Sequence, residues 1–517
     1  MRFKSSIHLA SLYITCYISA PGGSAVAAPS EPPPRLSLSM AEAVDRALAA
    51  NVDLAQQRLR PPQAAERVKE AQGAYDVQLG VNAAYRSENL PVDTALAGTP
   101  QLDTQTTDVG VSLERRLDTG GSIRLGFDSQ RSSTNAAYAL FDPAYRSGLS
   151  LQVQQPLLRD RAIDADRERL RRSRKEAAAA DLELQDAVSG IRAEVRRRYY
   201  DLIAALDAHR ASETSLELAR ALLAQNRARV AAGAAGSLEI AEAEAEVATR
   251  LEDVIVADAA VRAAEDGLKR LILPRDAEAS LWRARIVPTD PPSAERLDLD
   301  VEAAVTRALD GRLDIAAARR RVEAVEISAG FLRDQSKPRA DMIASYGTAG
   351  LDGTELIRDT FGGPVRRTVP GGYGDAVRSA FGQDHRTWTV GVNVSHAIGN
   401  RRGKALAARG RLELEDARAE LRRLEMDVIA EVREAARGVE TGFQRLEATR
   451  AAHALQVERL RAEERRREAG MSTSFLVTQA QRDLALAEVA EIRAVADYGK
   501  SLVELERVQT GRAVRGR

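Results

Sequence analysis

The sequence predicts a mainly helical fold in which two long coiled-coil hairpins, one in each half of the chain, are joined to strand-forming regions. Three observations predict it: a long run without proline, a second copy of its apolar pattern, and alternating apolar residues between the helices. The composition agrees, because 4% aromatic and 29% charged residues are typical of long helices with solvated flanks.

The longest helix is predicted over residues 165–230, which contain no proline and only Gly190 as a helix breaker. Apolar or nearly apolar residues recur there at every seventh position: Val188, Val195, Leu202, His209, Leu216, Leu223 and Val230. This spacing indicates a coiled-coil seam. At 1.5 Å per residue the helix would be roughly 100 Å long, so it must pack against helices of comparable length.

The chain is a tandem duplication. A string over 38–58 recurs from Leu299, with seven matching residues 261 positions apart, among them Val44 with Val305 and Asp53 with Asp314. The seam recurs 237 positions on, as Val432, Val439, Leu446, His453 and Leu460. The difference between the two offsets gives the first copy a net 24 extra residues between its opening helix and its hairpin tip.

Between the helices, the sequence predicts strands. Apolar residues alternate with polar or small ones in six segments: 77–85, 109–113, 123–127, 149–153, 340–346 and 388–394. Stretches rich in Gly, Pro, Asn and Asp between them predict solvent loops: 88–106, 133–145 and 347–385. A tight turn at Asp118-Thr119-Gly120-Gly121 predicts a hairpin over about 107–132, the candidate for the extra residues of the first copy.

The N-terminus predicts a secretory signal peptide, with Arg2 and Lys4, an apolar run over 7–18 and small residues at 25–27. Cleavage after Ala27 removes Cys16, the only cysteine, so we expect no disulfide and no thiolate metal site. No apolar run of about 18 residues follows, so no membrane-spanning helix is expected and any membrane insertion would use strands.

The sequence offers no pattern for enzyme chemistry or nucleic-acid binding. Lys+Arg 75 balances Asp+Glu 75, which leaves no overall basic field for nucleic acid. No phosphate-binding loop, zinc-ligand spacing or nucleophile elbow occurs in the sequence. We therefore expect no catalytic residue, cofactor site or metal site.

The best functional candidates are the two hairpin turns, Ala232-Gly233-Ala234 and Ala469-Gly470-Met471. Each glycine can end a long helix by taking a left-handed conformation, and Ser237 or Ser474 can cap the helix that follows. Three carboxylates near these turns are candidates for an acidic ring at an entrance: Glu239, Glu463 and Glu464.

This order of features, in duplicate behind a signal peptide, resembles the TolC-like outer-membrane efflux protein family. Five segments carry the resemblance: the openings through Ala43-Val44 and Ala304-Val305, Gln155-Pro156-Leu157-Leu158, Ile398-Gly399-Asn400-Arg401, and Asp497-Tyr498. Ala397 departs from the pattern, because the family usually has proline there, and the second strand-to-helix corner is therefore less constrained.

The resemblance implies a homotrimer whose helices form a shared α-barrel across the periplasm and whose strands form a shared transmembrane β-barrel. Four strands per chain are expected, or six if both arms of the hairpin over 107–132 enter the membrane. The implied function is the exit duct of a tripartite efflux or type I secretion system in the Gram-negative outer membrane, in contact with its lipid. It would passively conduct substrates from an inner-membrane pump and a periplasmic adaptor, which the two turns would contact.

Two alternatives stay open, a periplasmic adaptor and an exported structural coiled coil without a pore. An adaptor should carry one hairpin flanked by lipoyl-like and small barrel modules, and a purely structural coiled coil leaves the alternating strands unexplained. The expected organisation of the chain is a signal peptide (1–27), a first repeat (28–273, with strands over 75–156 and a hairpin over 165–273), a linker (274–297), a second repeat (298–508, with strands over 339–398 and a hairpin over 402–508) and a tail (509–517).

Overall fold

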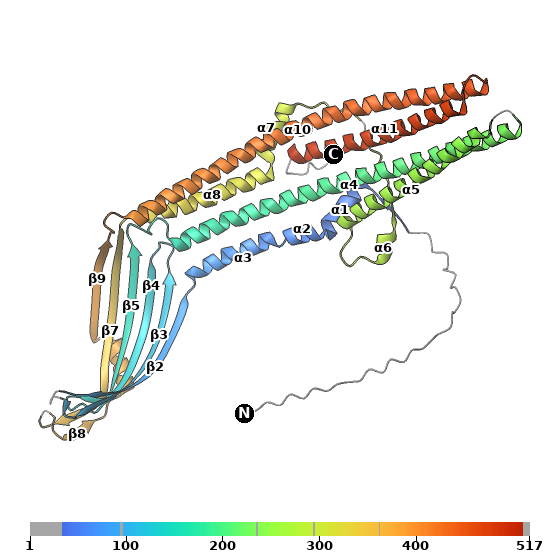
Figure 1. Cartoon of the computed structure of the whole chain (residues 1–517). Coiled ribbons are helices and arrows are strands. Elements are labelled where there is room, and N and C mark those ends of the chain that lie inside the picture. The colour runs from blue at the N-terminus through green and yellow to red at the C-terminus, as the bar shows by residue number, and fades with distance from the viewer. Residues whose placement is uncertain (1–33, 94–96, 234–235, 293–294, 361, 510–517) are drawn as a thin grey trace, which may run out of the picture.

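The computed structural model describes residues 34–93, 97–233, 236–292, 295–360 and 362–509. The chain is elongated, with a sheet at one end and two helical hairpins that run away from it to two neighbouring tips (Figure 1). The predicted signal peptide, Ala234 and residues 510–517 of the predicted tail lie outside the described residues. Within the described residues, no helix is both long and apolar enough to cross a membrane.

Two very long helices dominate the molecule, α4 (Ala165–Ala231) and α10 (Arg401–Glu468), of 67 and 68 residues. They return as α5 (Leu238–Ile272) and α11 (Ser474–Gln509), about half as long. The prediction of a long helix over 165–230 is therefore confirmed. Asp164 caps α4, because its carboxylate accepts a hydrogen bond from the backbone N–H of Arg167 at 2.8 Å.

Because α5 and α11 are only about half as long as α4 and α10, shorter helices pack against the rest of the two long helices. Helix α8 (Leu313–Asp334) packs against both α4 and α10, and α3 (Arg60–Gln72) packs against α4, on the side of the molecule nearer the sheet (Figure 1). The helices that open the two repeats are α1 (Met40–Ala50) with α2 (Val52–Gln57), and α7 (Val301–Gly311). Helices α1 and α7 have the same length and begin behind Ser39 and Asp300, whose side chains cap them.

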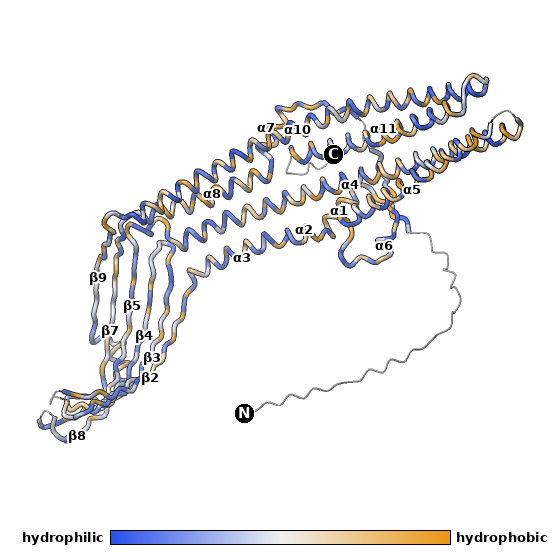
Figure 2. The backbone as a smooth tube through the Cα atoms, viewed as in Figure 1, coloured by the Kyte–Doolittle hydropathy of each residue, from blue (hydrophilic) through white to orange (hydrophobic). Residues whose placement is uncertain are grey.

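The predicted seam is buried or half-buried in both hairpins. Three of its residues in α4 and four in α10 are buried: Val195, Leu202, Leu216, Val432, Val439, Leu446 and Leu460. Around them lie two larger apolar clusters, one per repeat, and a small third cluster near the tips, formed by Leu222, Leu460, Val477 and Ala480. Figure 2 shows apolar and polar residues interspersed along all four long helices, which is the pattern of a buried seam between solvated faces.

One antiparallel sheet holds all the longer strands. Its members are β2 (Gln78–Pro91), β3 (Gln101–Arg116), β4 (Ser122–Thr134), β5 (Phe141–Pro156), β7 (Arg339–Arg358), β8 (Val365–Val369) and β9 (His385–Ser395). The first five are hydrogen-bonded in that order, and both β9 and β8 pair with β7. All six predicted strand segments are therefore strands.

The predicted solvent loops are wrong in their extent. Strand β2 continues to Pro91, β3 already begins at Gln101, and β7 continues to Arg358. At the end of the sheet far from the helices, both faces carry polar side chains. A strand with two polar faces has the composition of a loop, so these strand ends were predicted as loops. The segment 347–385 also contains β8 and a short helix, α9 (Tyr373–Gly382).

Helix α9 lies against the face of the sheet formed by β5 and β7. Its Ala376 and Ala380 are fully buried, and Phe381 lies beside Phe127 with ring centroids 6.1 Å apart. The close approach requires Gly350, because a Cβ at that residue would lie 1.9 Å from the backbone oxygen of Ala376.

A small parallel sheet of β1 (Arg35–Leu38) and β6 (Arg285–Pro288) ties the start of the first repeat to the predicted linker. The linker also contains α6 (Ala279–Arg283), and the turn η1 (Gly73–Tyr75) precedes β2. Tyr199 of α4 holds this region together, because its buried hydroxyl donates to the Leu38 carbonyl at 2.9 Å and accepts from the Thr289 N–H at 3.1 Å. Four-residue strands were not predicted, since they are too short to show an alternating pattern.

Candidate functional site

The two hairpin turns are built on the same backbone geometry. Gly233 and Gly470 both have left-handed backbones, with φ of 72° and 73°. In the second turn, Gly470 N–H donates to the Arg467 carbonyl at 3.0 Å and Met471 N–H donates to the Arg466 carbonyl at 2.8 Å. These are the two hydrogen bonds of a Schellman motif, so the predicted role of glycine in ending both helices is confirmed.

The predicted serine caps are wrong. Ser237 has a helical backbone, with φ of −61° and ψ of −20°, and its side chain makes no cap hydrogen bond. At the second turn, the Thr473 hydroxyl accepts from the Leu476 N–H at 3.4 Å, and Ser474 is the first residue of α11. The Ser474 side chain makes a contact with the other hairpin instead.

Both turns present exposed apolar side chains. Ala232, Gly233, Ala469 and Gly470 are exposed, and Met471 is 74% exposed. The sequence analysis missed two larger residues beside them, Leu238 at 69% and Phe475 at 61% exposed. These two are 237 positions apart, the offset that relates the two seams, so alignment of the repeats could have found them.

Glu239 connects the two hairpins. Its carboxylate Oε2 accepts a hydrogen bond from the Ser474 hydroxyl at 2.7 Å, and its backbone carbonyl accepts from the Asn226 side-chain amide at 3.2 Å. Asn226 and Ser474 are 1% and 4% exposed. Glu239 therefore serves as a hydrogen-bond acceptor at the contact between α4, α5 and α11, near the tip.

Glu463 belongs to the second turn itself. Its carboxylate accepts from the Ser472 hydroxyl at 2.7 Å and pairs with Arg466 at 3.0 Å, and these contacts lower the pKa of Glu463. Glu464, the next residue, is partly exposed. Burial and the charge of Arg229 lower the pKa of Arg467, and the carboxylates of Glu464 and Glu239 partly offset this lowering. That the three carboxylates form an acidic ring at an entrance stays a prediction.

A buried ion cluster joins the hairpins further from the tip. The Glu246 side chain is 2% exposed and accepts from Arg250 Nε at 2.9 Å and from Arg482 Nε at 2.8 Å. Arg250 also reaches Asp253 at 3.1 Å. Because Arg482 lies on α11 and Glu246 on α5, this cluster fixes the relative position of the two returning arms. The hydrogen bond that Arg482 donates to Glu246 raises the pKa of Arg482.

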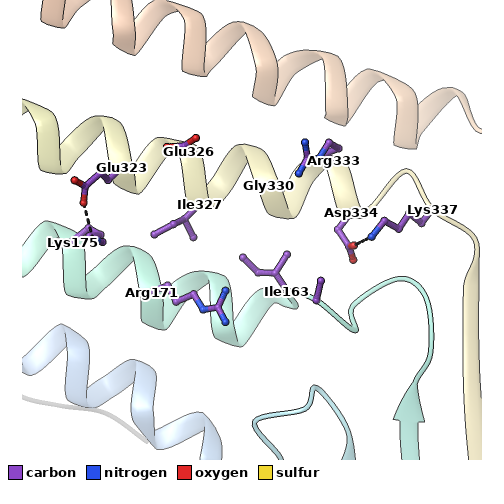
Figure 3. A pocket seen from close by; sticks show the side chains of 11 residues that line it. Ile163, Arg171, Lys175, Glu323, Glu326, Ile327, Gly330, Arg333, Asp334 and Lys337 are labelled. Carbon is purple, nitrogen blue, oxygen red and sulfur yellow. Dashed lines mark hydrogen bonds and ion pairs between the residues drawn. The ribbon is translucent and has the colours of Figure 1, made fainter.

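At the other end of the helices, a cavity of about 560 Å³ lies between α4 and α8 (Figure 3). Ion pairs lie at its rim, Lys175 with Glu323 at 2.7 Å and Lys337 with Asp334 at 2.5 Å, and Ile163 and Ile327 point into it. Across the described ranges, no three His, Cys, Asp or Glu side chains are grouped so as to hold a metal ion.

Comparisons with known proteins agree on one family. The sequence profile of the outer membrane efflux protein family matches residues 122–272 and 304–509. Among solved structures, a membrane protein from Pseudomonas aeruginosa superposes with a TM-score of 0.67 at 21% identity, covering 92% of this chain and 91% of that one. The outer-membrane channel OprN gives 0.66 at 17% identity (92% and 90% covered), and the CmeC outer membrane channel of Campylobacter jejuni gives 0.64 at 16% identity (91% and 85% covered).

No curated protein matches the chain in sequence. The family profile nevertheless spans both repeats, including both long hairpins. The predicted resemblance is therefore confirmed: the chain belongs to the outer membrane efflux protein family and is a protein of the Gram-negative outer membrane.

Proposed function

We propose that this protein is the outer-membrane exit duct of a tripartite efflux or secretion system and that it works as a homotrimer. It would passively conduct substrates delivered by an inner-membrane pump and a periplasmic adaptor. The observation that carries the proposal is the arrangement of two duplicated hairpins, which leave one sheet together and end in adjacent tips (Figure 1). No step in this role requires bond chemistry in the chain.

The sheet supports a shared β-barrel. Strands β2 and β9 are its two outer long strands, and among the described residues each pairs with one neighbouring strand only. Unpaired backbone groups are costly in lipid, so both strands need partners there. Pairing β2 of one copy with β9 of the next supplies these partners and closes a ring.

The tips support contact with an adaptor. Leu238 and Phe475 project from equivalent positions of the two repeats, and Met471 adds a third exposed apolar side chain. Exposed apolar residues gathered at one end of a molecule mark a protein-interaction surface. In a trimer, these residues would form a ring in which each hairpin tip presents one apolar patch. The tips of a ring of adaptors could pack against these patches.

Substitution of the tip residues tests the proposal. Leu238→Asp and Phe475→Asp, singly and combined, are expected to abolish efflux of a fluorescent dye from the native bacterium, measured as the rate at which loaded cells lose fluorescence. Trimers in the outer membrane, detected by heat-modifiable electrophoresis, should stay at wild-type levels. Leu486→Asp is the matched control, because Leu486 of α11 is 70% exposed but lies away from the tip. Normal efflux in the double variant would refute the tip assignment, and absence of trimers in the wild type would refute the duct.

A further inference from the structure

The hairpin that distinguishes the first repeat from the second lies inside the sheet. Its arms are β3 and β4, which pair in register from Thr104 with Thr134 to Arg116 with Ser122. Strand β3 also pairs with β2 along fourteen residues, and β4 pairs with β5 along eleven. The hairpin therefore separates β2 from β5 and adds two full-length strands between them.

One face of the sheet carries a row of apolar residues across all six long strands, and α9 packs on this same face over β5 and β7. A row of directly paired residues crosses the whole sheet: Leu79, Leu113, Leu125, Leu151, Tyr346 and Trp388. One neighbouring row on this face adds Val81, Val111, Phe127 and Leu149 and continues to Thr348 and Arg386. The other adds Ile123, Val153, Ala344 and Val390, with Arg115 as its member on β3. At least one arm of the hairpin supplies an apolar residue to each of these rows.

The opposite face is polar across the same strands. The adjoining row consists of Gln78, Glu114, Arg124, Gln152, Ser345 and Thr389. In the hairpin, Glu114 and Arg124 are direct cross-strand partners of opposite charge, so they compensate each other. Alternation in register with the neighbouring strands is what a wall between lipid and water requires.

The apolar band of β2 continues onto the hairpin. On β2 it covers the seven residues Leu79 to Tyr85, of which Leu79, Val81 and Ala83 pair directly with Leu113, Val111 and Val109 on β3. Trp388 of β9 lies in the same row as Leu79. Seven residues span about 23 Å along a strand. A hairpin that extended above or below the membrane would have no reason to repeat this band, and its apolar side chains would face water.

We propose that both arms of the hairpin form part of the membrane wall, so that each chain contributes six strands and the trimer forms an eighteen-stranded barrel. The inference rests on the proposed trimeric duct and deepens it. The diameter of a barrel grows roughly linearly with strand number, so this exit would be about one and a half times as wide as that of a twelve-stranded trimer. A barrel of this size encloses a water-filled channel, which suits bulky, hydrated cargo.

Spin labelling of the full chain in lipid vesicles tests the wall directly. Single cysteines are introduced into Cys16→Ser chains, and collision rates are measured with oxygen, which concentrates in lipid, and with a water-soluble nickel chelate. Val111→Cys and Leu125→Cys report on the apolar face of the hairpin, and Ser112→Cys reports on its polar face. Val390→Cys and Thr389→Cys on β9 are the matched controls, because they lie on the corresponding faces of an outer strand.

We expect Val111→Cys and Leu125→Cys to collide with oxygen as often as Val390→Cys, and Ser112→Cys to collide with the chelate as often as Thr389→Cys. Lipid contact at Val390→Cys with water contact at Val111→Cys and Leu125→Cys would overturn the six-stranded wall and leave the duct intact. Water contact at all three would overturn the membrane placement of the sheet, and with it the proposed function. A count of twelve strands by electron microscopy of the reconstituted trimer would also overturn the inference.

Discussion

Replacing Glu246 by alanine should loosen the contact between the two hairpins more than any exposed substitution nearby. The carboxylate is 2% exposed and holds two guanidinium groups, one on its own helix and one on α11. Arg250 is only 11% exposed, so loss of Glu246 leaves it with Asp253, whose own side chain is 47% exposed. Arg482 is 53% exposed, and water can solvate it.

The magnitude follows from these exposures. Removing one partner of a buried ion pair costs about 3–5 kcal/mol. Asp253 and water compensate part of the exposed charge, so we expect a value near the lower limit, about 3 kcal/mol. Each 1.4 kcal/mol is a factor of ten in an equilibrium constant, so local opening of α5 and α11 should become roughly a hundredfold more frequent.

Hydrogen–deuterium exchange of the full chain measures this opening. Amides of α5 and α11 around Glu246 and Arg482 should exchange roughly a hundredfold faster in Glu246→Ala, whereas the strands should keep their rates. Glu242→Ala is the matched control, because Glu242 is exposed one turn earlier on the same helix. Equal exchange in the two variants would refute the view that the cluster holds the hairpins together. Replacing Glu246, Arg250 and Arg482 together by leucine should restore slow exchange, since a buried ion cluster can be exchanged for apolar packing without loss of stability.

Two further predictions concern the tip and the contact between α4 and α11. Gly470→Ala should destabilise the second turn by about 1 kcal/mol, because alanine strains a backbone with φ of 73° even though nothing crowds its Cβ. Gly438→Ala, inside α10, is the control and should stabilise that helix by about 0.5 kcal/mol. Hydrogen–deuterium exchange of the tip amides should become faster only in Gly470→Ala. Burial opposes the charge of Glu504, but hydrogen bonds from Arg507 and the charge of nearby Arg197 lower its pKa. The contribution of Glu504 to the free energy of unfolding is therefore fully present above the ordinary glutamate pKa of about 4.3, and it is lost as the pH falls through the lowered pKa. Glu504→Gln should therefore lower the thermal midpoint at neutral pH, by the equivalent of about 0.5 kcal/mol, and this difference should shrink in acid; a difference independent of pH would contradict the assignment.

The long helices could be predicted because their cause is local. A seam residue every seventh position, repeated 237 positions on, fixes both the helix and its need for a partner, and the seam is buried or half-buried in both copies. The strands were predictable only where one face is apolar. Above the band, residues such as Glu88 and Thr104 pair directly across β2 and β3, yet their polarity is that of a loop. The hydrogen-bond register that makes them strands is set by the neighbours lower in the sheet.

The tip shows where sequence reasoning ends. The left-handed glycines follow from local backbone chemistry and were predicted at Gly233 and Gly470. Ser474 has an equally good local reason to cap a helix, but its hydroxyl is used 235 positions away, at Glu239. Which hydrogen bonds a short polar side chain makes therefore depends on the helix that packs beside it as well as on its own neighbours in sequence. The duplication carries the information that the local pattern lacks, because Leu238 and Phe475 occupy equivalent positions of the two repeats and are both exposed. We therefore assign partner binding to these exposed apolar side chains and not to the helix caps.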